Sequence, residues 1–176
     1  MITPDTKDWT WVLDQTCTEC GFDAKLYSRE DVAGLIRRNA KLWEQLLSDG
    51  LVTRVRPDQT TWSPLEYACH VRDVFSTFEL RIGLMLTTQD PVFVNWDQDL
   101  SAITERYYEQ DPVTVIGALA VAAEIVAHRL DGVQENEWQR PGRRSDGALF
   151  TVETISRYMI HDPIHHIWDV TRTHRI

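Results

Sequence analysis

The chain has 176 residues, of which 43% are hydrophobic and 26% are charged, a balance that is typical of one globular domain with its own core. Its formal net charge of -9 and its lack of extended Lys and Arg patches argue against nucleic-acid binding, which depends on clustered positive charge. The beginning of the chain lacks the basic start and apolar run of a secretory signal, and no stretch approaches the roughly 20 apolar residues that span a bilayer. We therefore expect one cytoplasmic domain over residues 1–176, with neither a membrane nor a nucleic acid as partner.

Two helices are expected in the first half of the chain. Residues 28–48 carry apolar side chains at helical spacing behind Ser28, a good N-cap residue, and Asp49-Gly50 marks the end of that helix. The second helix begins at Ser63-Pro64-Leu65-Glu66, which combines an N-cap serine, a proline at the first helical position and a capping-box glutamate. Its apolar stripe continues for about five turns, until Asp90-Pro91 breaks the pattern.

Two more helices are expected in the second half, over 112–130 behind Asp111-Pro112 and over 151–172. The mixed stretch 92–110 between the second and third helices predicts a long connection with a short helix over 100–109. Residues 138–147 predict a polar loop or a short hairpin. Together these elements predict an all-α four-helix bundle with a long crossover between its second and third helices.

Histidines on two of these helices form the most informative pattern in the sequence. His161 and His165 are four residues apart, so they stand one turn apart on one face of the fourth predicted helix. His70 lies about two turns into the second predicted helix, beside its apolar stripe. Three imidazoles that meet between facing helices would bind a divalent metal and leave coordination positions open, as in a catalytic site. The alternative is three core histidines that are bonded to carbonyls or acids.

Pro163 lies between the two histidines of the fourth predicted helix. A proline inside a helix removes one backbone hydrogen bond and can kink the helix. Alternatively, Asp162-Pro163 could cap and start a new helix, and His161 and His165 would then lose their alignment. We favour one continuous helix because the apolar register continues beyond the proline.

Ionisable groups beside the histidines are the candidates for catalysis. Asp73 follows His70 on the same predicted helix, and Asp162 and Asp169 flank the histidine pair. Metal-bound imidazoles usually donate their second N–H to such an acid, although surface ion pairs are the alternative for all three aspartates. His166 points about 100° away from His165 around the helix, as a general base or as a hydrogen-bond donor to a neighbouring helix. Asp73, Asp162 and His166 are therefore the predicted catalytic residues.

A cysteine pair lies near the beginning of the chain. Cys17-x-x-Cys20-Gly21 resembles half of a zinc ribbon or a redox pair. A structural zinc would need two more ligands, and the chain has no second cysteine pair. We favour a tight local turn for this pair and a core position for Cys69. The segment 1–27 that contains the pair is expected to pack on the bundle.

Two longer stretches, Trp62 to Asp73 (WSPLEYACHVRD) and Tyr158 to Val170 (YMIHDPIHHIWDV), resemble the DinB/YfiT-like superfamily of bacterial metal-dependent bundles. The resemblance covers nearly the whole chain, and the opening DWTWVL and CTECGFD stretches are similar to an actinobacterial branch. It implies an up-down-down-up helix order, a divalent ion such as zinc or nickel, and often a homodimer. The metal positions of the family fall on His70, His161 and His165.

The resemblance implies two kinds of reaction on a small-molecule substrate. Related members act as thiol transferases or isomerases that use a low-molecular-weight thiol, mycothiol or bacillithiol, and others resemble metal-dependent hydrolases. The residues of this chain do not separate the two reactions. A stress-related bundle that binds a metal or a small ligand without catalysis is the alternative from another class. A metal-free interaction module would keep the three histidines apart.

Overall fold

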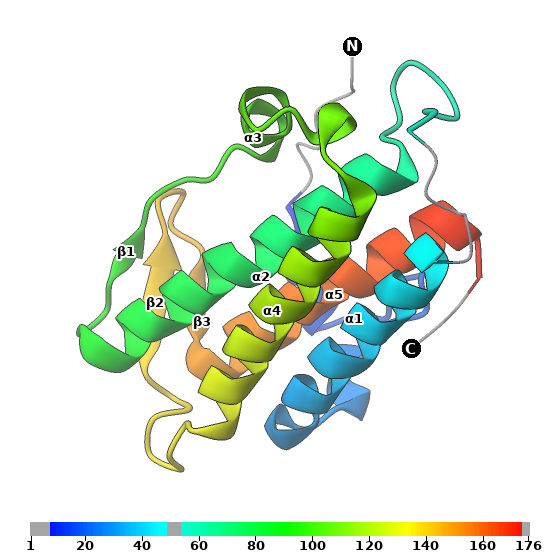
Figure 1. Cartoon of the computed structure of the whole chain (residues 1–176). Coiled ribbons are helices and arrows are strands. Elements are labelled where there is room, and N and C mark those ends of the chain that lie inside the picture. Colours follow the sequence, from blue (N-terminus) through cyan, green and yellow to red (C-terminus); the bar gives the residue numbers. More distant parts are fainter. Residues whose placement is uncertain (1–7, 49–53, 174–176) are drawn as a thin grey trace.

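Four long helices build the computed structural model, which describes residues 8–48 and 54–173 (Figure 1). They are α1 (Val32–Ser48), α2 (Pro64–Thr87), α4 (Pro112–Asp131) and α5 (Val152–Thr171). Both α1 and α2 pack against α4 and α5, so α1 and α2 lie diagonally across the bundle. The predicted all-α four-helix bundle is therefore confirmed, while the up-down-down-up order stays a prediction. The end signal Asp49-Gly50 lies outside the described residues.

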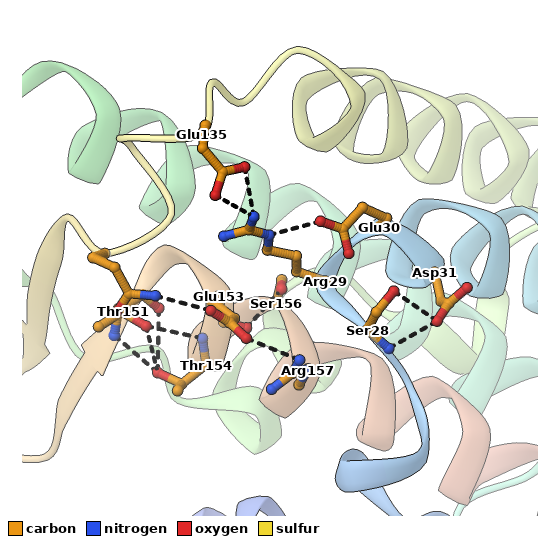
Figure 2. Close-up of polar contacts among 11 residues, drawn as sticks. Ser28, Arg29, Glu30, Asp31, Glu135, Thr151, Glu153, Thr154, Ser156 and Arg157 are labelled. Carbon is orange, nitrogen blue, oxygen red and sulfur yellow. Dashed lines mark hydrogen bonds and ion pairs between the residues drawn. The ribbon is translucent and has the colours of Figure 1, made fainter.

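Local capping interactions fix where the helices begin. Ser28 forms a capping box around a short 3-10 turn, η3 (Arg29–Asp31), directly before α1, and Thr151 forms a second capping box at the start of α5. Figure 2 shows both caps, and between them Arg29, which forms an ion pair with Glu135 beyond the end of α4. Because these signals are local, the predicted helix starts agree closely with the structure.

The crossover between α2 and α4 contains more structure than the sequence predicts. It consists of β1 (Val92–Phe93), α3 (Gln98–Thr104) and a 3-10 turn, η4 (Tyr107–Glu109). The predicted helix over 100–109 is split because Arg106 adopts the left-handed conformation, with φ at 51°. β1 pairs in parallel with β2 (Pro141–Arg144), and β2 pairs antiparallel with β3 (Leu149–Thr151). The predicted hairpin is thus confirmed, and β1 is too short to give an alternating pattern in the sequence.

Helix α4 differs from the expectation that no stretch of the chain is long and apolar enough to span a bilayer. By length and apolar composition it could cross a membrane, with a hydropathy of 1.7 over its most apolar window. Val115, Leu119, Val126 and Leu130 are buried in the helix that packs against both α1 and α2. A core helix of a bundle shows the same composition, because one of its faces is buried along its whole length.

The beginning of the described chain packs on α5. This N-terminal segment, residues 8–27, contains two 3-10 turns, η1 (Trp9–Leu13) and η2 (Ala24–Leu26), and both contact α5. Val12 and Phe22 of the segment are fully buried. Residues that are far apart in the sequence therefore share one part of the core.

Gly142 in β2 generates a prediction about packing beside the sheet. A Cβ at this position would lie 2.6 Å from Cζ of Phe93 and 2.8 Å from Cγ of Met85. We expect Gly142→Ala to lower the free energy of unfolding by about 1–3 kcal/mol, the usual cost of overpacking. Gly117→Ala in α4 is the control, because a Cβ there meets no atom within 4 Å and alanine has the higher helix propensity. Urea unfolding of both variants tests this, and an unchanged midpoint for Gly142→Ala would contradict it.

Candidate functional site

Helix α5 contributes side chains to two separate groups of potential metal ligands. One group consists of Cys17, Cys20, His161 and His165, which are all buried. The other consists of His70, Asp162 and His166, and we call it the α2–α5 triad. Within each group the ligand atoms lie within 4.8 Å of one another. Among the described residues, His70 therefore belongs to a different group from His161 and His165.

This arrangement does not bring the three predicted histidines into one group, and the metal ligands stay a prediction. His161 and His165 do share one face of α5, with their ring centroids 5.2 Å apart, because the helix continues through Pro163. Asp162 and His166 have the same spacing one residue further along, so their face is rotated by about 100°. This second face meets His70, whereas the first meets the N-terminal segment.

In the α2–α5 triad, the carboxylate of Asp162 lies between two imidazoles. Its Oδ1 atom is 3.2 Å from Nε2 of His70 and 3.4 Å from Nε2 of His166. In the described structure Oδ1 is buried and forms no hydrogen bond, while Oδ2 of the same carboxylate is 3.5 Å from Nε2 of His70. Oxygen and nitrogen ligands of one tetrahedral zinc would be about 3.3 Å apart. The two separations therefore suit donors that share one cation.

Neighbouring side chains hold both imidazoles of the triad in place. The ring of His70 is fully buried and stacks on Trp96 with a centroid distance of 5.4 Å and an interplanar angle of 4°. Nδ1 of His166 is 2.9 Å from Oδ2 of Asp169. A carboxylate that accepts from the second ring nitrogen turns Nε2 toward the metal position. Asp169 therefore lies where an outer partner of His166 is expected, and its role beside a metal stays a prediction.

Electrostatics keep both aspartates of this region ionised. Burial opposes the charge of Asp162, but the nearby His70 and His166 outweigh it and hold the pKa of Asp162 below its ordinary value. Burial also opposes the charge of Asp169, and the hydrogen bond from His166 lowers the pKa of Asp169 in turn. Asp162 is thus in the form that a metal ligand requires.

The cysteine pair forms the tight turn that the sequence predicts. The N–H of Gly21 donates to the carbonyl of Cys17 over 2.8 Å, and the N–H of Cys17 donates to the carbonyl of Phe22 over 2.8 Å. Gly21 has a φ of 77°, a conformation that favours glycine. The turn brings both thiols to one point, which faces His161 and His165.

Burial dominates the protonation of this second group. It raises the pKa of the Cys20 thiol to about 12 and lowers the pKa of His161 to about 4. Without a cation the Cys20 thiol and the His161 imidazole are therefore neutral at pH near 7. Sequence reasoning weighed the cysteine pair and the histidine pair separately. The signal that it missed is their combination, because Cys-x2-Cys and His-x3-His are the ligand spacings of Cys2His2 zinc sites.

Asp73, the third predicted catalytic residue, lies outside both groups. Its carboxylate accepts a hydrogen bond from Nε of Arg72 over 2.7 Å and another from the hydroxyl of Tyr107. The side chain therefore links α2 to η4. Proximity to His70 in the sequence does not place it at a metal position, because its helix face is directed at the crossover.

A cavity of about 990 Å³ opens beside the α2–α5 triad. Asp162 and His166 of the triad line it, as do His161, His165 and Asp169, and the side chain of Asp162 is 36% exposed. Two cationic side chains, Arg81 and Arg144, also line it, together with six carboxylate side chains: Glu19, Asp97, Asp99, Asp146, Asp162 and Asp169. Its aromatic walls are formed by Trp9, Trp62, Tyr67, Phe78, Phe93, Trp96 and Tyr158. The triad is thus accessible from a cavity of the size of a small-molecule site.

Comparisons with known proteins agree with this architecture. The model of the DinB superfamily matches residues 35–170, a range that includes the α2–α5 triad and excludes the cysteine pair. Among solved structures, YfiT from Bacillus subtilis aligns with a TM-score of 0.68 and 16% sequence identity over 90% of each chain. YfiT is described as a probable metal-dependent hydrolase with an unusual four-helix bundle topology. At this identity the likeness shows the fold alone, and no curated protein matched the sequence.

Interactions at the start of α2 fix the position of His70 one turn further along the helix. Glu66 lies one turn before His70, is 1% exposed, and accepts hydrogen bonds from the Ser63 hydroxyl over 2.8 Å and from Nε of Arg56 over 2.9 Å. Burial opposes its charge, yet these hydrogen bonds outweigh burial and hold the pKa of Glu66 below its ordinary value. The stabilisation from this carboxylate is therefore present above pH of about 4.3, the usual pKa of glutamate, and is lost at lower pH.

We therefore predict a pH-dependent stability difference between the wild type and Glu66→Gln. At pH near 7 the variant should lose about 1–3 kcal/mol of unfolding free energy, because a charged hydrogen-bond acceptor is removed from a buried site. The difference should shrink as the pH falls below about 4.3. Urea titrations over this pH range measure it, and Glu135→Gln, whose side chain is 84% exposed, should show little effect at any pH. A difference that does not change with pH would contradict the prediction.

Proposed function

This chain belongs to the DinB superfamily, and we propose that it is a metal-dependent hydrolase whose divalent ion is bound by the α2–α5 triad. One observation carries the proposal. Oδ1 of Asp162 lies between Nε2 of His70 and Nε2 of His166 without forming a hydrogen bond, beside a cavity. The description of YfiT as a probable metal-dependent hydrolase supports the same reaction class.

The donor set of the triad fits a catalytic ion. Two imidazoles and one carboxylate are the protein ligands of several hydrolytic zinc sites, and they also suit other first-row divalent ions. Zinc and nickel are therefore both compatible with the set. When bound, such an ion supplies Lewis-acid chemistry that activates water or polarises a carbonyl group.

The side chains of the protein contribute orientation and exclusion of water. Asp169 fixes the ring of His166, and Trp96 covers the ring of His70. Both contacts hold a ligand in one orientation before any ion is bound. Since His70 is fully buried and Asp162 is partly exposed, a substrate in the cavity approaches the triad from the side of Asp162.

The cavity wall supports a substrate that carries an anionic group. The guanidinium of Arg81 lies over the ring of Phe78 at 4.9 Å and over that of Phe93 at 5.7 Å. Among the described residues no carboxylate forms an ion pair with it. A guanidinium that is held between apolar rings binds a carboxylate or a phosphate in a fixed geometry. We infer that Arg81 binds the anionic group of a small-molecule substrate.

The thiol-transfer reaction is the second candidate. An ion at the triad would also hold a low-molecular-weight thiol as thiolate, and the resemblance implies such relatives. We favour hydrolysis because this donor set is that of hydrolytic zinc sites. A binding protein without catalysis is less well supported, because Asp162 and His166 are directed at a cavity.

The proposal predicts how aspartate variants affect turnover. Tag-free protein would be loaded with zinc, nickel or manganese and assayed with esters and amides of small carboxylic acids. It would also be assayed with mycothiol or bacillithiol plus an electrophile. We expect Asp162→Asn to lower kcat/KM by at least about 100-fold, and Asp169→Asn by about 10–100-fold, because outer ligands affect metal affinity and activity to that extent.

Asp73→Asn is the matched control, since Asp73 lies outside both ligand groups, and it should keep its activity. Equal losses in Asp73→Asn and Asp162→Asn would contradict the assignment of the triad. Turnover that requires both a thiol and an electrophile would show that the reaction is thiol transfer and not hydrolysis. Metal binding without turnover of any tested substrate would favour the binding protein.

A second prediction concerns Arg81. We expect Arg81→Met to raise KM for anionic substrates by about 10–100-fold, which corresponds to the loss of one hydrogen bond to a charged group. Neutral esters of the same shape should show a much smaller change. Arg129→Met is a suitable control, because Arg129 is paired with Glu79 and does not line this cavity. An equal rise in KM for charged and neutral substrates would show that Arg81 has a packing role.

A further inference from the structure

We propose that the protein has a second, structural zinc site, separate from the α2–α5 triad, which fastens the N-terminal segment to α5. Its ligands are Cys17, Cys20, His161 and His165. The inference does not depend on the proposed hydrolase function, because the two groups share no ligand. Its cysteine ligands precede the range matched by the DinB model, whereas its histidine ligands lie within that range.

The distances between the donors agree with one tetrahedral ion. Zinc binds sulfur at about 2.3 Å and imidazole nitrogen at about 2.0–2.1 Å, so a sulfur and a nitrogen ligand are about 3.6 Å apart at the tetrahedral angle. Sγ of Cys17 is 3.6 Å from Nδ1 of His165. A weak S–H···N hydrogen bond would also explain this single contact. It would leave the buried Nε2 of His161 without a partner, as it is in the described structure.

The chemistry and burial of the donor set indicate a structural ion. Two thiolates and two imidazoles form a soft set that favours zinc over magnesium, calcium or manganese. All four residues are at most 8% exposed. A closed set of four protein ligands is typical of structural zinc, whereas a catalytic site keeps a position open. The partly exposed triad, with three ligands, shows that second arrangement.

Acidic and aromatic side chains surround the four potential ligands. Nε2 of His165 faces the carboxylates of Glu19 at 3.7 Å and Asp169 at 3.8 Å, which favours Nδ1 of that ring as the ligand atom. Trp9 packs on His161 and His165 with centroid distances of 5.3 Å and 5.1 Å. Acidic partners for the free ring nitrogen and an apolar cover for the ligands are usual around zinc.

Zinc at this site would join parts of the chain that are distant in sequence. The turn from Cys17 to Cys20 also carries Glu19, which lines the cavity beside the triad. Trp9 of the same segment forms another part of the cavity wall. Since His161 and His165 also line this cavity, the structural ion would fix one side of it.

Cobalt substitution of the full-length, tag-free protein tests the site directly. Cobalt bound by cysteine thiolates gives intense near-ultraviolet charge-transfer absorption, which imidazole and carboxylate ligands do not give. We expect this absorption in the wild type and its loss in Cys17→Ser. Cys69→Ser is the matched control, because Cys69 is buried in α2 outside the group, and it should keep the absorption. Asp162→Asn should also keep it, which separates failure of this site from failure of the proposed hydrolase function.

A measurement on the wild type covers the case in which Cys17→Ser does not fold. Thiol alkylation followed by mass spectrometry should show Cys17 and Cys20 protected in zinc-loaded protein and modified after chelation, with Cys69 unchanged. Elemental analysis of Asp162→Asn, which lacks one ligand of the triad, should show the loss of one tightly bound zinc on chelation. Equal alkylation of Cys17 and Cys20 with and without zinc would overturn the proposal. A Cys17–Cys20 disulfide in the purified protein, or full charge-transfer absorption in folded Cys17→Ser, would also overturn it.

Discussion

The whole arrangement depends on the continuity of α5 through Pro163. With about 100° of rotation per residue, the pair His161 and His165 and the pair Asp162 and His166 occupy neighbouring faces of one helix. One face meets the N-terminal segment and the other meets α2. A helix that restarted at Asp162-Pro163 would break both pairs, because each has one member before the proline and one after it. The tolerance of α5 for a buried proline is thus the condition for both ligand groups.

Asp169 connects the two groups electrostatically. It is 2.9 Å from Nδ1 of His166 in the triad and 3.8 Å from Nε2 of His165 in the cysteine group. Its position, three residues after His166 and four after His165, places it one turn beyond both rings. A single carboxylate is therefore hydrogen-bonded to His166 and lies within ion-pair distance of His165 on the neighbouring face of the helix. A change of charge in either group would therefore alter the electrostatic environment of the other group, because Asp169 lies beside both.

Sequence reasoning succeeded where the physical signal is local. The start of α2 follows from Ser63-Pro64 and Glu66, and the turn at Cys17 follows from the glycine behind the second cysteine, because each signal lies within a few residues of its effect. It failed where the packing of distant segments decides which side chains meet. The histidine-rich stretch of α5 offers two pairs with the same spacing, and the partner of each pair depends on which face α2 and the N-terminal segment occupy. The surroundings of Asp73 also depend on such packing, since Tyr107 of the crossover donates a hydrogen bond to it.

The chemical difference between the two groups gives a reason for both to exist on one helix. A soft cysteine-containing set retains zinc against harder ions, whereas an imidazole and carboxylate set accepts several divalent ions and keeps positions open. Under the two proposals, the closed site would hold the N-terminal segment, including Trp9 and Glu19, at the cavity of the open site. The segment precedes the range that matches the DinB model. The N-terminal segment, held by the closed site, would thus supply part of the cavity wall. Changes in the sequence of this segment would alter the substrate without altering the catalytic ligands.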